Sequence, residues 1–241
     1  MNRRFSVVLV EPTSSANIGA VCRAMANFGV EDLRLVSPQC NYDDEEASRL
    51  AVFAAPLLRR AVVFSDLTAA LADCHYSVAA TRRSGGCRNK LAPLSRVAAD
   101  LFAQTAHVAL VFGRERSGLT TEEVMSCSHA AAIDTSENGS LNLAQAVVVF
   151  LYEFSREMVA PSALESASLP TQGDYDRLFL SMEEVLEKIG YINRQKPEAL
   201  MNRVRRIHQT VSNRDDLNML QGIWTRLAES VNSWPGERRG K

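Results

Sequence analysis

Hydrophobic positions along the chain fall into two alternating patterns. Short runs such as residues 5–10 (FSVVLV) and 107–112 (HVALVF) are almost wholly apolar and end abruptly at polar or glycine residues. Such runs are typical of parallel strands that are covered on both faces. Between them, as in residues 17–28, apolar residues recur at helical spacing, and Gly29 follows as a stop. The alternation predicts an α/β domain with a mostly parallel sheet.

The same pattern gives approximate bounds for the elements of this domain. The predicted strands span residues 5–10, 33–36, 62–64, 77–81, 107–112 and 130–134. The predicted helices span residues 17–28, 43–54, 67–71, 93–103, 120–127 and 141–159.

The last of these helices is followed by a change of character. Its middle, VVVFLY at residues 147–152, is apolar on nearly all sides, so we expect it to be buried in the fold or against a partner chain. A proline- and serine-containing linker follows, and then three amphipathic helices. The sequence therefore predicts an α/β domain at 1–160, a linker at 161–173 and a small all-helical domain at 174–241. The three helices are expected at 174–189, 197–211 and 216–231.

A polar loop between two glycines lies at the centre of the α/β domain. Gly113 and Gly118 bracket a charged segment directly after the buried run 107–112, and they allow the backbone to turn sharply. Thr120 is suited to cap the next helix, with Glu123 completing a capping box. A strand that ends in such a loop and feeds a helix is where open α/β sheets bind ligands.

Composition limits the class of protein. The chain has 241 residues, 46% of them hydrophobic, and no apolar run approaches the length of a membrane span. The first apolar run is too short for a signal peptide. Five cysteines form no CxxC pair, which favours reduced thiols and a cytoplasmic protein over disulfides or zinc. We therefore expect no membrane segment and no metal.

Basic residues are concentrated in two segments although the net charge is only −1. Residues 81–99 contain five basic residues and no acid, and residues 188–206 contain six with one acid. Two basic segments on a neutral chain fit contacts to a phosphate backbone. Ordinary solvated faces explain the same pattern, so charge alone leaves both interpretations open.

Common nucleotide motifs are missing from the sequence. No GxGxxG follows a strand, and no GxSxG or HExxH is present. Residues 113–118 have the spacing of a P-loop, but Leu119 occupies the place of its lysine, which argues against ATP hydrolysis.

Three loops at strand exits do match a known pattern. They are residues 17–23 (NIGAVCR), 112–119 (FGRERSGL) and 140–144 (SLNLA), and their order and separations resemble the three motifs of the SpoU branch of the SPOUT methyltransferases. The resemblance implies a deep trefoil knot, bound S-adenosylmethionine, and a homodimer with active sites between chains. It also implies methylation of a ribose 2′-hydroxyl in tRNA, at cytidine or uridine thirty-two. Methylation of ribosomal RNA or of another tRNA position, and a non-catalytic RNA-binding role, stay open as alternatives.

The motif positions imply a set of cofactor contacts. These are Ala80, Thr81, Arg82, Gly113, Ile133, Gly139, Ser140, Leu141 and Asn142. Two segments depart from the pattern of the family. GTSAR in the relatives is AATRR at residues 79–83, and SSLNL is GSLNL at residues 139–143.

The implied reaction suggests roles for five polar residues. A ribose hydroxyl is a poor nucleophile at neutral pH, so its proton must be removed or its developing charge stabilised. We expect Arg23 to hold a phosphate and stabilise the alkoxide, because an arginine is a poor base. Ser140 can bond the hydroxyl, Asn17 or Asn142 can orient loop and phosphate, and Glu115 is expected to pair with an arginine. Helix capping by the two asparagines and a loop salt bridge for Glu115 are the structural alternatives.

The basic segments and the central loop supply the predicted RNA contacts. These are Arg82, Arg83, Arg88, Lys90, Arg114, Arg203, Arg205 and Arg206.

Overall fold

The computed structural model describes residues 4–82, 91–102, 106–136, 139–156, 169–192, 200–202, 204–205 and 214–232. The chain divides into two compact units, Met1–Ser166 and Ala167–Lys241, each of which is considered by itself. None of the helices in the described part of the chain is long and apolar enough to cross a membrane.

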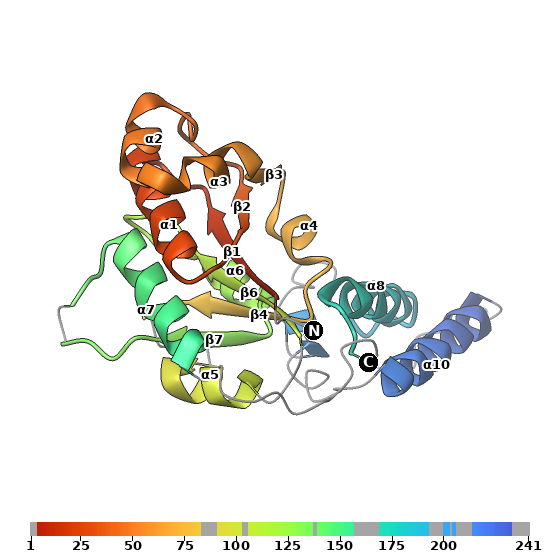
Figure 1. Ribbon diagram of the computed structural model, residues 1–241. Coiled ribbons are helices and arrows are strands. Elements are labelled where there is room, and N and C mark those ends of the chain that lie inside the picture. Colours follow the sequence, from red (N-terminus) through yellow and green to blue (C-terminus); the bar gives the residue numbers. More distant parts are fainter. Residues whose placement is uncertain are drawn as a thin grey trace. The chain divides into compact units, whose positions relative to one another are not determined.

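The first unit is built on a seven-stranded sheet in which all pairs are parallel (Figure 1). Its order is β3-β2-β1-β6-β4-β7-β5. The strands are β1 (Arg4–Val10), β2 (Asp32–Val36), β3 (Val62–Phe64), β4 (Tyr76–Ala80), β5 (Leu91–Pro93), β6 (His107–Phe112) and β7 (His129–Ala132). All six residues of β6 are buried. The predicted parallel α/β fold is confirmed, whereas the knot stays a prediction.

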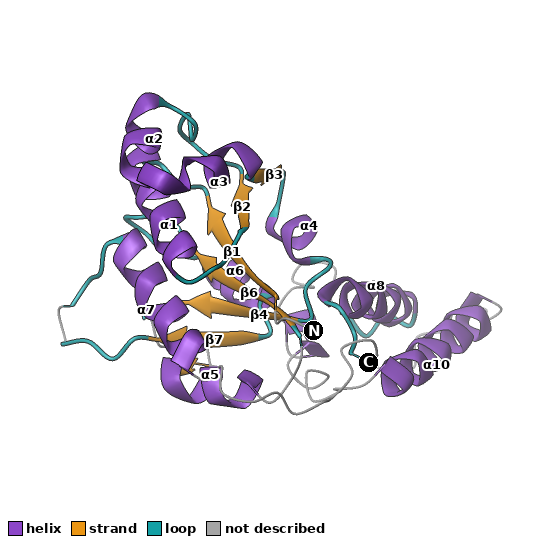
Figure 2. Cartoon of the chain, in the orientation of Figure 1, coloured by secondary structure: helices purple, strands orange, loops and turns teal. Residues whose placement is uncertain are grey.

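Helices cover both faces of this sheet (Figure 2). Successive residues of β1 point to opposite faces, so Val7 packs in one apolar cluster and Val8 in another. The first cluster contains side chains of α1 (Ser15–Asn27), α2 (Glu45–Ala51), η1 (Val52–Ala54), α3 (Ala55–Arg60), α5 (Leu94–Phe102) and α7 (Leu143–Arg156). The second contains side chains of α4 (Leu67–Leu71) and α6 (Thr121–Ser126).

Local backbone chemistry moves several boundaries away from the predicted ones. The single helix expected at 43–54 is divided, because Val52 adopts a φ of 55° and ends α2, and the short helix α3 follows. Strand β5 was also not predicted, because Pro93, its last residue, was placed at the start of the helix expected at 93–103. Helix α1 begins at Ser15, because the Ser14 hydroxyl caps it.

The second unit contains α8 (Gln172–Lys188) and α10 (Arg214–Asn232), which pack through Leu178, Met182 and Leu217. Residues 200–202 and 204–205 are also helical, within the range predicted for the middle helix. Asp174 completes a capping box with Thr171 and accepts a hydrogen bond from Arg214, at 2.7 Å. The helical character predicted for this part of the chain is confirmed.

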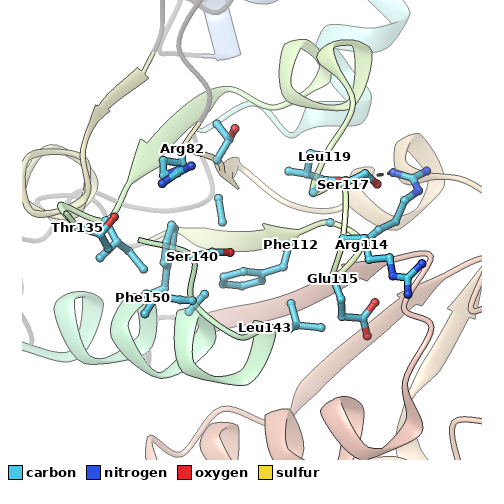
Figure 3. Close-up of a pocket in the computed structure, with 18 of the residues that line it drawn as sticks. Arg82, Phe112, Arg114, Glu115, Ser117, Leu119, Thr135, Ser140, Leu143 and Phe150 are labelled. Carbon is cyan, nitrogen blue, oxygen red and sulfur yellow. Dashed lines mark hydrogen bonds between the residues drawn. The ribbon is translucent and has the colours of Figure 1, made fainter. Parts of the chain in front are cut away.

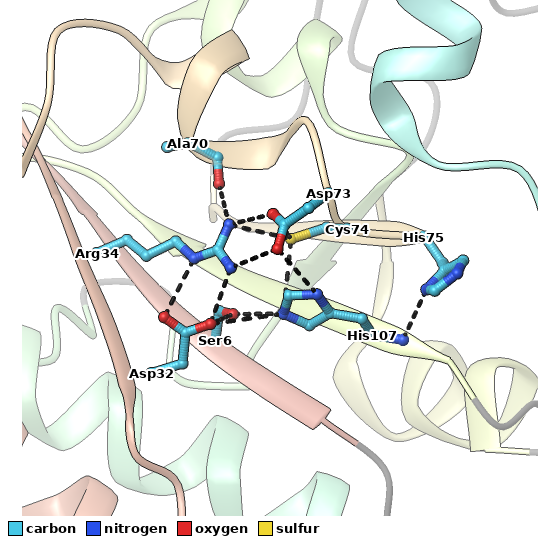
Figure 4. A network of polar contacts seen from close by, with 8 residues as sticks. All are labelled: Ser6, Asp32, Arg34, Ala70, Asp73, Cys74, His75 and His107. Carbon is cyan, nitrogen blue, oxygen red and sulfur yellow. Dashed lines mark hydrogen bonds and ion pairs between the residues drawn. The ribbon is translucent and has the colours of Figure 1, made fainter. Parts of the chain in front are cut away.

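A buried polar cluster lies where β1, β2 and β6 begin (Figure 4). Arg34, only 4% exposed, bonds both Asp32 and Asp73. Ser6 Oγ lies 2.6 Å from Asp32 Oδ2 and 2.5 Å from His107 Nε2. These contacts place two carboxylates, a guanidinium and an imidazole at the amino ends of three neighbouring strands.

The same cluster holds the one group of side chains in the described residues with metal-ligand spacing, Asp73, Cys74 and His107. The Arg34 guanidinium already lies among them, with Nη1 3.7 Å from Cys74 Sγ and bonded to Asp73. Burial raises the pKa of the Cys74 thiol to about 12, which keeps it protonated. The Arg34 guanidinium therefore already supplies the positive charge that a bound cation would bring to these ligands.

We predict that Asp73→Asn lowers the free energy of unfolding at pH 7 by about 1 kcal/mol, the value of a charged hydrogen bond reduced for the half-exposed side chain. The Arg34 hydrogen bond lowers the pKa of Asp73 from 3.8 to about 2. The stabilisation is therefore complete above pH 3.8 and is lost as pH falls towards 2. Urea unfolding at pH 7 and pH 3 measures this, with the exposed Asp43→Asn as control. A difference between wild type and variant that stays constant with pH would contradict it.

Candidate functional site

A cavity of about 320 Å³ lies at the carboxyl ends of β4, β6 and β7 (Figure 3). The loops after these strands and the start of α7 line it. The lining includes eight of the nine predicted cofactor contacts: Ala80, Thr81, Arg82, Gly113, Ile133, Gly139, Ser140 and Leu141. Asn142, the ninth, lies beside the cavity lining rather than in it. Segments 80–82, 113–119, 133–135 and 139–141 thus share one site although the first two are far apart in sequence from each other and from the rest.

The loop between Gly113 and Gly118 is tight enough to require both glycines. Gly118 has a φ of 67°, which favours glycine. A Cβ on Gly113 would lie 2.2 Å from the carbonyl carbon of Gly118, so no other residue fits without moving the backbone. Arg114 and Gly118 form an antiparallel bridge that closes the loop.

Arg114 fixes this loop to two neighbouring elements. Its guanidinium bonds Glu11 at the exit of β1, at 2.8 Å, and Glu123 in α6, at 3.0 Å. Glu123 also accepts from the backbone of Thr120, which confirms the predicted capping box. Glu11 has a φ of 47°, uncommon for a residue other than glycine. Arg114 is therefore a structural bridge, and its predicted contact with RNA would have to compete with two carboxylates.

Glu115 points the other way and joins the loop to the start of α1. Among the described residues, Glu115 does not show the arginine partner that was expected; it accepts hydrogen bonds from Thr13, Ser14 and Asn17. Burial alone would raise the pKa of this carboxyl, but hydrogen bonds from Asn17 and Thr13 outweigh burial and lower the pKa below its usual value. Glu115 is therefore ionised at neutral pH and acts as an acceptor.

Asn17 extends this contact to the third loop. Its Nδ2 donates to Glu115 Oε1 at 3.1 Å, and its Oδ1 accepts from Asn142 Nδ2 at 2.9 Å. Asn142 Oδ1 in turn accepts from the backbone of Ala144 at the start of α7. Three of the five predicted catalytic residues thus form one hydrogen-bonded chain, Glu115–Asn17–Asn142, in which Asn142 also has the alternative capping role.

The two remaining predicted catalytic residues lie apart. Ser140 is exposed and lines the cavity. Arg23 lies on an exposed face of α1 and is not part of the cavity lining of its own chain.

The predicted RNA contacts are only partly within the described residues, since Arg83, Arg88, Lys90, Arg203 and Arg206 lie outside them. Arg82 is exposed, and its Nη1 donates to the Gly139 carbonyl at 2.6 Å. Arg205 is half-buried, with its guanidinium over the Phe179 ring, 5.4 Å from the centroid.

Several residues of the site were missed by the sequence analysis. The apolar wall of the cavity comes from Phe112 and from Leu143, Ala146 and Phe150, which recur at helical spacing on one face of α7. That spacing was visible in the sequence. Thr13, which donates to Glu115 at 2.8 Å, carried no comparable signal.

Comparisons with known proteins agree with this arrangement. A family model described as the SpoU rRNA Methylase family matches residues 4–152, and a model described as the C-terminal domain of tRNA methyltransferase TrmJ matches residues 173–234. The tRNA (cytidine/uridine-2'-O-)-methyltransferase TrmJ of Yersinia enterocolitica is 33% identical, over 98% of this chain and 95% of its own.

Solved structures show the same likeness. TrmJ from Z. mobilis superimposes with a TM-score of 0.81 at 30% identity, covering 94% of this chain and 99% of its own. The methyltransferase AviRb of Streptomyces viridochromogenes, in complex with the cofactor AdoMet, has a TM-score of 0.52 at 22% identity. It covers 66% of this chain and 62% of its own, and it shows a shared fold. Since one family model spans most of the chain and the TrmJ relatives match nearly all of it, the chain belongs to the SpoU rRNA Methylase family, in the group with the TrmJ C-terminal domain.

Proposed function

We propose that the protein transfers the methyl group of S-adenosylmethionine to a ribose 2′-hydroxyl in tRNA, at cytidine or uridine thirty-two of the anticodon loop. The observation that carries the proposal is the Glu115–Asn17–Asn142 chain, which joins the three motif loops beside one cavity. The names of the TrmJ relatives support tRNA as the substrate and cytidine or uridine as the nucleotide.

The cavity fits the proposed cofactor. Its volume of about 320 Å³ is that of a small-molecule site. Phe112, Leu143 and Phe150 offer an apolar wall for a purine ring, and the loop backbones at Gly113 and Gly139 offer polar groups. Leu119, in the place of a P-loop lysine, is buried, so the site is not built for a triphosphate. When bound, S-adenosylmethionine would supply an electrophilic methyl group on its sulfonium sulfur.

The residues of this chain position the other reactant. Ser140, exposed at the cavity, can bond the 2′-hydroxyl that must lose its proton. Glu115, with a lowered pKa and several donors, is suited to hold Asn17 and Asn142 rather than to accept that proton. The site thus orients the hydroxyl, and stabilisation of its developing charge requires a cation.

We infer that Arg23 of a second subunit supplies this cation in a homodimer. Arg23 does not line the cavity of its own chain, and α7 exposes Val148 and Tyr152 beside its buried residues. Leu151, by contrast, is 2% exposed and packs within its own chain, so the partner contact would use the Val148 face. We expect Arg23 to stabilise the forming alkoxide and the adjacent phosphate.

Transfer of labelled methyl groups to an unmodified tRNA transcript tests the function. We expect incorporation that disappears in a matched transcript with a 2′-deoxynucleotide at position thirty-two. Equal incorporation into both transcripts would place the reaction at another nucleotide, and incorporation into ribosomal RNA alone would favour the ribosomal alternative. If the protein does not bind S-adenosylmethionine in the presence of tRNA, the result would favour the non-catalytic RNA-binding alternative.

Mixing two inactive variants tests the role of Arg23. We predict that Arg23→Ala and Glu115→Ala each lower turnover on the order of a hundredfold or more. Dimers formed after mixing and re-equilibrating equal amounts should recover about a quarter of wild-type activity, because each mixed dimer contains one intact site. Mass spectrometry should first show that the mixture contains mixed dimers. If such a mixture recovers no activity, Arg23 acts on the cavity of its own chain.

The arginines of the second unit are predicted to divide into two kinds. Replacing Arg203 and Arg206 with glutamine should weaken tRNA binding and reduce its salt dependence by about one unit of slope per lost phosphate contact. Turnover at saturating tRNA should be unchanged. Arg205→Ala should instead lower the melting temperature, because Arg205 packs on Phe179. If the salt dependence of tRNA binding is unchanged in the double variant, Arg203 and Arg206 do not contact the RNA.

A further inference from the structure

One side-chain hydrogen bond joins two of the loops around the cavity. Arg82, two residues after the end of β4, donates from Nη1 to the carbonyl of Gly139, at 2.6 Å. The two residues are separated by more than fifty positions, and both line the cavity. Figure 3 shows Arg82 on the side of the cavity near Thr135, away from Glu115. The Glu115–Asn17–Asn142 chain fixes the segment Gly139–Asn142 at Asn142, and the Arg82–Gly139 bond fixes the other end of the segment.

The bond depends on the side chain at position 82. An alanine there could not form it, since alanine has no donor beyond its backbone.

The backbone around Gly139 lies too close to Thr135 to leave room for a side chain at position 139. A Cβ on Gly139 would lie 2.7 Å from Thr135 Cβ and 2.8 Å from Thr135 Oγ1. The Gly139 amide donates to the Ser136 carbonyl at 2.8 Å, so the backbone cannot shift freely to make room. Glycine at 139 is therefore needed for the conformation that presents its carbonyl to Arg82.

We propose that Arg82 is a positioning residue that holds the segment Gly139–Asn142 against the cavity before the cofactor binds. The proposal rests on the proposed function, because its ligand is S-adenosylmethionine. A guanidinium-to-carbonyl bond is charge-assisted and short, so it restrains the segment more strongly than a neutral contact does. A segment that is already in place pays less ordering entropy on binding. The bond also restrains Ser140, the neighbour of Gly139 that lines the cavity.

Binding and exchange measurements on Arg82 variants test the proposal. In Arg82→Ala we expect the Kd for S-adenosylmethionine and for its demethylated product to rise about threefold to tenfold. Amide hydrogen exchange of residues 139–142 in the cofactor-free protein should speed up, with the denaturant midpoint unchanged. Arg82→Gln keeps a donor without the charge and should recover part of both losses. Arg59→Ala removes an exposed arginine on α3 and serves as the matched control.

A second variant tests the partner. Gly139→Ser places a Cβ against Thr135, so it should weaken cofactor binding as Arg82→Ala does. The double variant should be little weaker than either single variant, because each breaks the same contact. Losses that multiply fully would show that the residues act independently and would overturn the proposal.

Two further results separate this proposal from the function itself. If Arg82→Ala weakens binding while exchange of residues 139–142 is unchanged, Arg82 contacts the ligand directly and the proposal is wrong. If wild type binds no S-adenosylmethionine with or without tRNA, the proposed function fails. Exchange in residues 139–142 then still reports whether the Arg82–Gly139 bond restrains the segment.

Discussion

The carboxylate of Glu115 is the contact on which the geometry of the site depends. It accepts hydrogen bonds from Thr13, Ser14 and Asn17, and through Asn17 it reaches Asn142. Loops lack the regular hydrogen bonds that align neighbouring strands. Three loops therefore keep a fixed geometry relative to one another only if contacts between them hold them in place. A single ionised acceptor with several donors does this more economically than separate contacts could. The orientation of Glu115 depends in turn on the loop that Gly113 and Gly118 close.

Strands β1 and β6 connect this site to the polar cluster at the opposite ends of the same strands. Ser6 and His107 lie near the beginning of the two strands, whereas Glu11 and Gly113 follow their ends. Parallel pairing brings like ends together, so one edge of the sheet gathers charges that stabilise the fold and the other gathers the loops of the site. Arg34 satisfies both of its carboxylate partners at the first edge. This division leaves the second edge free to carry function.

The sequence predicted what periodicity and short motifs encode. Runs such as residues 107–112 gave the strands, and the Thr120–Glu123 capping box was predicted from two residues. Contacts between distant residues were not predictable in the same way. Arg114 and Glu115 are adjacent, and nothing in the sequence says that one turns to Glu11 and the other to Asn17. The division of the helix at Val52 likewise depends on a single φ angle, which a pattern of apolar residues does not predict.

Electrostatics give a reason for the two directions that Arg114 and Glu115 take. Arg82, Arg114 and Arg116 all line the cavity, and three uncompensated guanidinium groups would repel a sulfonium ligand. Arg114 is bonded to both Glu11 and Glu123. These two carboxylates and the one guanidinium together carry a net negative charge when both carboxylates are ionised. The Arg114 hydrogen bond lowers the pKa of Glu11, which keeps this carboxylate ionised. Glu115, which points the other way, adds a third carboxylate beside the loop, and the hydrogen bonds that lower its pKa keep it ionised. The bridge that shapes the loop therefore also offsets the arginines, so that a cationic ligand can be held close to a site that must still attract RNA phosphates.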